Sequence, residues 1–89
     1  MKTRICTIKN ETGIHTRPAR HFVDTATDGY PGCEIKVIKG ERVINGKSVL
    51  SMLTLGAKFG EQITVEAHGE GEDQALAELG DIFEKIYQE

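Results

Sequence analysis

Apolar and polar residues alternate along three stretches of the chain, residues 2–8, 33–38 and 62–68. Such alternation is typical of a strand with one buried face and one face toward water. A shorter run, residues 42–44, follows Lys39-Gly40, a pair typical of a hairpin turn. The pattern therefore predicts four strands.

Helical patterns occupy three other stretches. Residues 18–27 carry one apolar stripe, which consists of Ala19, Phe22, Val23 and Ala26. Turn-forming residues at 28–32 predict the end of this helix. Residues 48–53 predict a short helix with Ser48 as its N-cap. The last stretch, residues 72–87, has a stripe made of Leu76, Leu79, Phe83 and Ile86, although Gly80 weakens it by about 1 kcal/mol.

The predicted order is strand, helix, strand, strand, helix, strand, helix. Each strand has one apolar face and each helix one apolar stripe, so these elements must pack as two layers. A four-stranded antiparallel sheet with three helices on one face satisfies the pattern. The sequence thus predicts an α+β open-faced sandwich over residues 1–89, as one domain.

Composition restricts the class of function. The 89 residues carry a net charge of −3 and few aromatic rings, whereas nucleic-acid binders usually have a basic excess with interleaved aromatics. No apolar stretch approaches the roughly 20 residues that a membrane span needs, and the N-terminus lacks a secretory pattern. We therefore expect a cytoplasmic monomer whose partners are neither nucleic acid nor membrane.

The two cysteines, Cys6 and Cys33, have no metal-ligand spacing and are too few for a disulfide framework. We interpret both as free thiols, and we expect no metal and no cofactor. His68 ends a predicted strand and is interpreted as a surface or structural residue.

The most informative segment is residues 13–20, Gly-Ile-His-Thr-Arg-Pro-Ala-Arg. Pro18 suits the first turn of a helix, because the N–H groups there have no intrahelical partner. His15 and Thr16 therefore fall at the helix start, and Gly13 permits a tight turn into it.

The charges in this helix contradict the usual preference. A helix N-terminus favours anions, yet Arg17, Arg20 and His21 all precede the first acid, Asp24. Free N–H groups, the helix dipole and an arginine together make an anion site. A neutral imidazole in such a site can act as a nucleophile as well as a ligand. The alternative is that His15 is only a solvated residue near a helix start.

Two segments resemble one family. Residues 13–19 resemble the active-site signature of the histidine-containing phosphocarrier protein HPr of the bacterial phosphotransferase system (PTS). Residues 47–56, Lys-Ser-Val-Leu-Ser-Met-Leu-Thr-Leu-Gly, resemble the family's serine-site segment. The resemblance covers essentially the whole chain. It implies a phosphoryl carrier that is a substrate of its partners more than an enzyme in its own right.

The resemblance also implies roles for single residues. His15 would accept a phosphoryl group on Nδ1 from phosphorylated enzyme I and pass it to sugar-specific IIA proteins. Arg17 would neutralise the phosphoryl oxygens. Ser48 matches the regulatory serine that an HPr kinase/phosphorylase modifies in many bacteria, which would alter docking to partners such as a transcriptional co-regulator. A serine that only caps a helix is the alternative.

Partner docking is implied for neighbouring residues. Val49, Leu50 and Leu53 match the family's apolar docking patch, with core packing as the alternative. Lys47 fits acidic partners. Arg20 stands where the signature usually has a small residue, so it either bears on partner choice or is simply solvated.

Better core candidates on the same short helix and its end are Met52 and Leu55.

The leading functional hypothesis is a sugar-transport phosphocarrier. One alternative is a regulatory relay of the same family, either nitrogen-branch or a transcription co-regulator. Another is an interaction module without chemistry.

Overall fold

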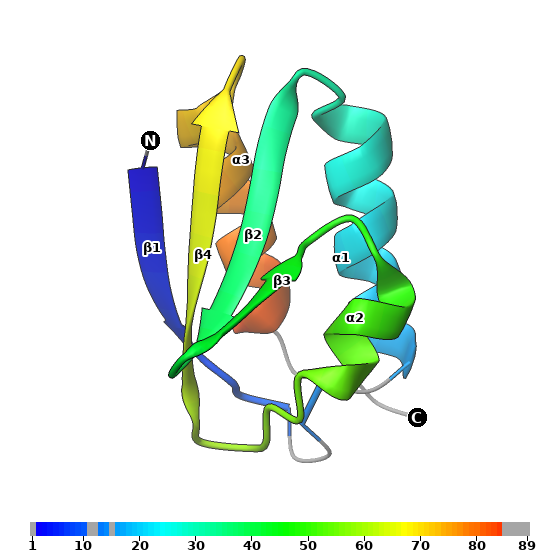
Figure 1. The fold of residues 1–89 in the computed structure, drawn as a ribbon, viewed down its shortest axis with the longest axis vertical. Helices are drawn as coiled ribbons and strands as arrows, with labels where there is room; N and C mark the ends of the chain where they lie inside the picture. Colours follow the sequence, from blue (N-terminus) through cyan, green and yellow to red (C-terminus); the bar gives the residue numbers. More distant parts are fainter. Residues whose placement is uncertain (1, 11–12, 15, 85–89) are drawn as a thin grey trace.

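The computed structural model describes residues 2–10, 13–14 and 16–84, and its elements follow the predicted order (Figure 1). The strands are β1 (Lys2–Thr7), β2 (Cys33–Lys39), β3 (Arg42–Asn45) and β4 (Gln62–Gly69). The helices are α1 (Thr16–Gly29), α2 (Val49–Thr54) and α3 (Glu72–Phe83). The predicted α+β fold is confirmed, while His15 and Ile86 lie outside the described residues.

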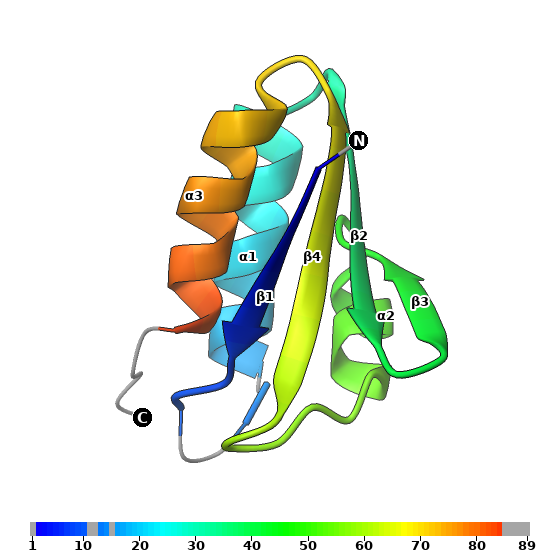
Figure 2. The same cartoon turned by 90° about the vertical axis from the view of Figure 1, so that its left-hand side faces the viewer.

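The sheet has the strand order β1-β4-β2-β3, and all neighbouring strands are antiparallel. Buried residues on alternate positions face each other across the strands, as in the pairs Cys6–Ile63 and Val37–Val65. Helices α1 and α3 cover one face of the sheet, and α2 lies beside α1 near the β3 edge (Figures 1 and 2). None of the described helices covers the opposite face, so the alternation in the sequence reflects one covered face.

The apolar stripe predicted for α1 is buried as expected. Phe22 stacks on Phe83 of α3, with ring centroids 4.5 Å apart, and this contact joins the two long helices. The predicted turn at residues 28–32 was wrong at its first two positions, because α1 continues to Gly29. The helix can do so because Pro31, which cannot continue a helix, comes only after the buried Tyr30.

The cap and core predictions for α2 are confirmed. Ser48 is extended at the helix start, and its Oγ accepts a hydrogen bond from the Ser51 N–H at 3.3 Å. Met52 and Leu55 are buried. A six-residue helix is therefore fixed by one cap and by two core side chains at its C-terminal end.

A glycine inside α3 has a specific packing reason. A Cβ at Gly80 would lie only 2.5 Å from a guanidinium nitrogen of Arg4, which reaches across from β1. Arg4 donates to the Ala77 carbonyl at 2.9 Å and pairs with Asp81 and Glu84, both at 3.0 Å. The absent side chain at Gly80 thus makes room for the arginine that joins β1 to α3.

Both cysteines are free, as predicted, and the structure buries both. Burial is the main cause that raises the pKa of the Cys6 thiol to about 11. A thiol is nucleophilic only as the thiolate, so Cys6 is an inert core residue at neutral pH.

Candidate functional site

The N-terminal turn of α1 combines an inward face and an outward face. Pro18 and Ala19 are buried, so the first turn is packed against the core. Thr16 and Arg17 are exposed, and the turn contains no acidic residue. The prediction that Thr16 lies at the helix start and Pro18 in its first turn is confirmed. The outward face therefore offers a cation and the positive end of a helix dipole to solvent.

The chain enters this turn through a tightly anchored segment. Gly13 has φ +74°, and a Cβ there would lie 2.6 Å from the Ala57 carbonyl oxygen. The next residue, Ile14, donates its N–H to that same carbonyl at 3.0 Å. The buried Asn10 closes the other side, because its Nδ2 donates to the Gly13 carbonyl at 3.0 Å. Gly13 and Ile14, which precede His15, are thus held by Asn10 and by the loop after α2.

The remaining cations of α1 lie along its exposed side. Arg20 pairs with Asp24 at 3.8 Å, and both side chains are more than half exposed. Such an i,i+4 pair contributes only about 0.3–0.5 kcal/mol. His21 is also exposed. Arg20 is therefore available on the surface, and its role in partner choice stays a prediction.

Helix α2 runs antiparallel to α1 and lies beside the N-terminal turn of α1. Ile14, before α1, is bonded to Ala57, after α2, while Lys47, before α2, donates its Nζ to the Tyr30 carbonyl, after α1, at 2.8 Å. Figure 1 shows the two helices side by side. The start of α2 therefore reaches the residue after α1 through the long Lys47 side chain, while the C-terminal end of α2 lies near the N-terminal end of α1.

Lys47, which the sequence analysis assigned to acidic partners, has a partner within the chain. Its ammonium occupies the negative end of the α1 dipole, where a cation is favourable. Tyr30 itself is tied to α3, because its hydroxyl donates to Glu78 at 2.6 Å. Lys47 thus has a structural function, and its contact with acidic partners stays a prediction.

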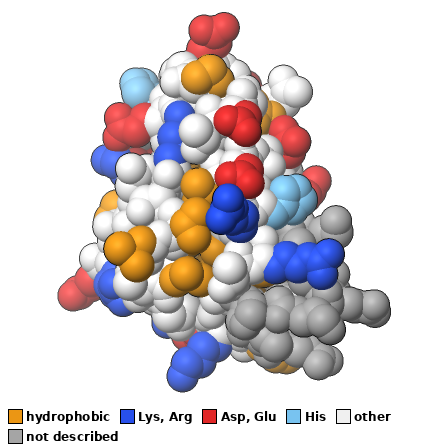
Figure 3. All heavy atoms as spheres, turned by 90° about the vertical axis from the view of Figure 1, so that its right-hand side faces the viewer, with side chains coloured by type: hydrophobic (Ala, Val, Ile, Leu, Met, Phe, Trp, Pro, Cys, Tyr) orange, Lys and Arg blue, Asp and Glu red, His pale blue; other side chains and the backbone are white. Residues whose placement is uncertain are grey.

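The apolar residues of α2 divide between core and surface. Leu50 is 74% exposed and Leu53 is 40% exposed, whereas Val49 is partly buried against the core. Figure 3 shows hydrophobic side chains gathered on this face, with basic side chains near them. Phe59, in the loop after α2, is a further exposed apolar residue at 59%. Sequence reasoning missed Phe59, because a single aromatic in a loop follows no period.

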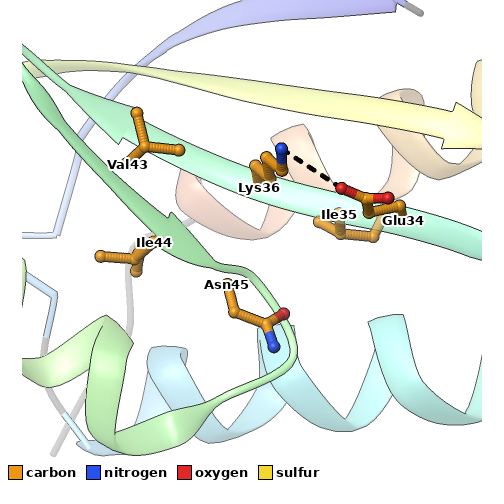
Figure 4. Close-up of a pocket in the computed structure, with 6 residues that line it drawn as sticks. All are labelled: Glu34, Ile35, Lys36, Val43, Ile44 and Asn45. Atoms are coloured by element: carbon orange, nitrogen blue, oxygen red, sulfur yellow. Dashed lines mark ion pairs between the residues drawn. The ribbon is translucent and has the colours of Figure 1, made fainter.

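A pocket elsewhere is unsuited to the chemistry of this site. It has a volume of about 360 Å³ between β2 and β3 and is lined by six residues, Glu34, Ile35, Lys36, Val43, Ile44 and Asn45 (Figure 4). Glu34 and Lys36 pair with each other at 3.2 Å. Its lining contains no histidine or cysteine nucleophile, and its position on the strands separates it from the start of α1.

The comparison with family models shows which family the chain belongs to. Residues 2–85 match the PTS-HPr family, described as "PTS HPr component phosphorylation site". The chain belongs to the HPr family. HPr proteins are phosphocarriers of the PTS, and the matched region includes both the segment at the start of α1 and the segment of α2.

Individual HPr relatives are similar over nearly the whole chain. The phosphocarrier protein HPr of Lysinibacillus sphaericus is 36% identical over 86 residues, which cover 97% of this chain and 96% of that protein. HPr of Pseudomonas aeruginosa is 34% identical, with 93% and 91% coverage. The crystal structure of HPr-C-His from Thermoanaerobacter tengcongensis superposes with a TM-score of 0.85 at 37% identity, covering 94% of this chain and 92% of that one.

Two further findings concern the described part of the chain. None of its helices has the length and apolar character that crossing a membrane requires. Within the same residues, no three histidine, cysteine or acidic side chains are grouped as metal ligands would be.

Proposed function

We propose that this chain carries a phosphoryl group on His15, which it receives from phosphorylated enzyme I and passes to sugar-specific IIA proteins. The observation that carries the proposal is the N-terminal turn of α1, which directly follows His15 in the chain. That turn presents Arg17 and Thr16 to solvent and contains no acid. It is an environment prepared for an anion that comes from outside.

The transfer needs few groups. The lone pair of the His15 Nδ1 attacks phosphorus, so that an N–P bond forms while the bond from phosphorus to the donor breaks. Arg17 balances the charge of the phosphoryl oxygens together with the positive end of α1. Phosphoryl transfer depends mainly on positioning and charge stabilisation, so such a small site is sufficient. The chain is then a substrate and donor for its partner enzymes, and it needs no cofactor.

Docking is assigned to the face that α1 and α2 share. Leu50 and Leu53 offer exposed apolar area, Val49 supports them from below, and Arg20 adds a cation at the α1 side. Lys47 stabilises the junction behind Ser48 and contributes positive charge toward acidic partners. This face lies next to the start of α1, so a docked partner reaches the phosphoryl group. We propose that the carrier does this as a cytoplasmic monomer.

Ser48 offers a point of regulation on the same face. Its Oγ caps α2, and a phosphate placed there by an HPr kinase/phosphorylase is compatible with the helix dipole. The fold would survive the modification, whereas a new negative charge beside Leu50 would change which partner docks. Release of enzyme I and recruitment of a transcriptional co-regulator are the expected consequences.

The carrier function is tested with enzyme I and labelled phosphoenolpyruvate. We expect a label that is acid-labile and alkali-stable, and that is absent from His15→Ala. His68→Ala is the matched control, because His68 is an exposed histidine at the far end of β4 and should keep the label. Label that persists in His15→Ala would disprove the assignment.

The regulatory role of Ser48 is tested separately with ATP and an HPr kinase. Ser48→Ala should lose the label, and Ser51→Ala, one turn further along α2, should retain it. A label that remains in Ser48→Ala would reject Ser48 as the modified residue while leaving the carrier function untouched.

A further inference from the structure

The loop between α2 and β4 is bonded to both ends of the segment that leads to His15. At one end, Ile8 donates its N–H to the Glu61 carbonyl and accepts from the Gly60 N–H, both at 2.9 Å. At the other end, Ile14 donates its N–H to the Ala57 carbonyl at 3.0 Å. The position of residues 8 and 14 therefore depends on the shape of this loop.

The side chains of Glu61 and Lys39 bond to the backbone of this loop and to each other. The Glu61 Oε1 accepts the Lys58 N–H at 2.6 Å and pairs with the Lys39 Nζ at 3.2 Å. The same Lys39 Nζ donates to the Gly56 carbonyl at 2.9 Å, so it joins the two ends of the loop. The Lys58 N–H bond and then Lys39 hold the pKa of Glu61 below its usual value. Lys39 is the last residue of β2, and it thus ties the loop to the sheet.

The loop contacts the segment before His15 so closely that no side chain fits at Gly13. Gly13 approaches the Ala57 carbonyl so closely that even a Cβ would lie 2.6 Å from its oxygen and 3.1 Å from the Lys58 Cα. A shift of the loop must therefore move Gly13 and Ile14, the two residues before His15. A misplacement of about 1 Å is enough to reduce a transfer rate substantially, by up to about 100-fold.

We infer that Lys39 and Glu61 are positioning residues for phosphoryl transfer at His15 and act through the loop of residues 56–61. This inference rests on the proposed carrier function. Neither residue belongs to the two signatures at 13–19 and 47–56. Their effect is mechanical: the ion pair holds the loop that contains the Ala57 carbonyl, this carbonyl holds the Ile14 N–H, and Ile14 directly precedes His15 in the chain.

The test compares Glu61→Ala and Lys39→Met with Glu41→Ala, which removes an exposed carboxylate from the β2–β3 turn. Two quantities are measured, the amide hydrogen-exchange rate of Ile14 and the steady-state kinetics of phosphoryl acceptance from enzyme I. We expect Ile14 to exchange about 10-fold faster in both loop variants and kcat to fall about 5- to 10-fold at an unchanged KM. Glu41→Ala should match the wild type, and Lys39→Arg should restore most of kcat.

Three outcomes would overturn the inference. The first is an unchanged hydrogen-exchange rate of Ile14 in Glu61→Ala, and the second is faster exchange of Ile14 with a wild-type kcat. The third is a higher KM with an unchanged kcat, which would assign the loop to docking. A wild-type chain that accepts no phosphoryl group at His15 would instead refute the carrier function, and the inference would fall with it. A wild-type chain that accepts the group while Glu61→Ala behaves like Glu41→Ala would refute the inference alone.

Discussion

Helices α1 and α3 pack against each other, yet their N-terminal turns are built on opposite principles. The first turn of α3 contains Glu72 and Asp73, so negative side chains offset the positive end of that helix. The first turn of α1 contains no acid and presents Arg17 instead. The α3 turn satisfies its dipole within the chain. The α1 turn has no acidic side chain to do so, and this difference supports the anion site proposed there.

The largest effect is expected when the charge at α1 is made to resemble that at α3. Arg17→Glu should reduce phosphoryl acceptance by about 100-fold or more, since it places a negative charge where the proposed function puts the phosphoryl oxygens. Initial rates of label transfer from enzyme I measure this effect. Circular dichroism should show an intact helix, because an acid suits a helix N-terminus. A wild-type transfer rate in Arg17→Glu would mean that the cation has no part in the site.

The entry to α1 should be the next most sensitive point. Gly13→Ala is expected to lower the free energy of unfolding by about 2–3 kcal/mol, because alanine at positive φ costs about 1–2 kcal/mol and its Cβ would also contact the Ala57 carbonyl. Gly56→Ala is the matched control, since Gly56 has the same φ of +74° with nothing within 4 Å of its Cβ position. Urea denaturation of both variants separates the cost of the contact with Ala57 from the cost of a positive φ. Equal losses of unfolding free energy in the two variants would show that the contact with Ala57 costs nothing.

The contact between the C-terminal end of α1 and α3 predicts a pH-dependent stability. The hydrogen bond to Glu78, and then burial, raise the pKa of Tyr30 to about 12. The neutral phenol is the form that the fold favours, so the stabilisation is complete below the ordinary tyrosine pKa near 10 and is lost as the pH rises through about 12. Tyr30→Phe should cost about 1–2 kcal/mol at pH 7.

The difference between wild type and Tyr30→Phe should narrow between about pH 10 and pH 12. Chemical denaturation of both proteins at each pH cancels the titration of lysines, which they share. A difference that stays constant up to pH 12 would show that the phenol proton does not contribute.

Within α3, the effect of Gly80→Ala on stability should change sign when the Arg4 side chain is removed. Gly80→Ala adds about 1 kcal/mol of helix propensity but displaces Arg4, whose hydrogen bonds are worth more together. The expected net result is a loss of about 1 kcal/mol in the free energy of unfolding. In an Arg4→Ala background the same substitution should stabilise by up to about 1 kcal/mol. Thermal melts of the four proteins test this, and equal signs in both backgrounds would refute the packing explanation.

The smallest effect is expected where the α3 turn is made to resemble that of α1. Asp73→Lys should lower stability by only about 0.5–1 kcal/mol, because it loses a favourable dipole interaction and a surface ion pair with Lys2. Phosphoryl acceptance should remain at the wild-type rate. A large loss of transfer in this variant would contradict the separation of the two helix ends.

The sequence predicted most of the fold because periodic patterns carry local information. The alternation in β4, the stripe of α1 and the cap at Ser48 each depend on residues within one element. The end of α1 was harder, since Asp28 and Gly29 are also common in turns and only the position of Pro31 favours a longer helix.

The parts of the site that the sequence did not reveal depend on contacts between distant segments. Gly13 was identified as a turn residue, but its neighbour Ala57 follows α2 in the chain. The same holds for Lys47 on Tyr30 and for Arg4 over Gly80. Pairings of this kind follow from the topology of the sheet and leave no short-range pattern. His15 and Ser48 were predicted because they lie in signatures, whereas Ala57 and Glu61, which bond to Ile14 and Ile8, lie outside both signatures.

The strand order gives the molecule a folding constraint that bears on its activity. β1 begins the chain but pairs with β4, so its register with residues 62–67 requires the closure of a loop that includes most of the protein. Contacts of such high sequence separation form slowly. Ile8, which follows β1 directly, is bonded to the loop that anchors Ile14. An isolated peptide of residues 10–30, or a nascent chain lacking β4, would therefore contain the histidine signature without its anchor. Under the proposed function, the chain becomes competent to carry the phosphoryl group only after β1 and β4 have paired.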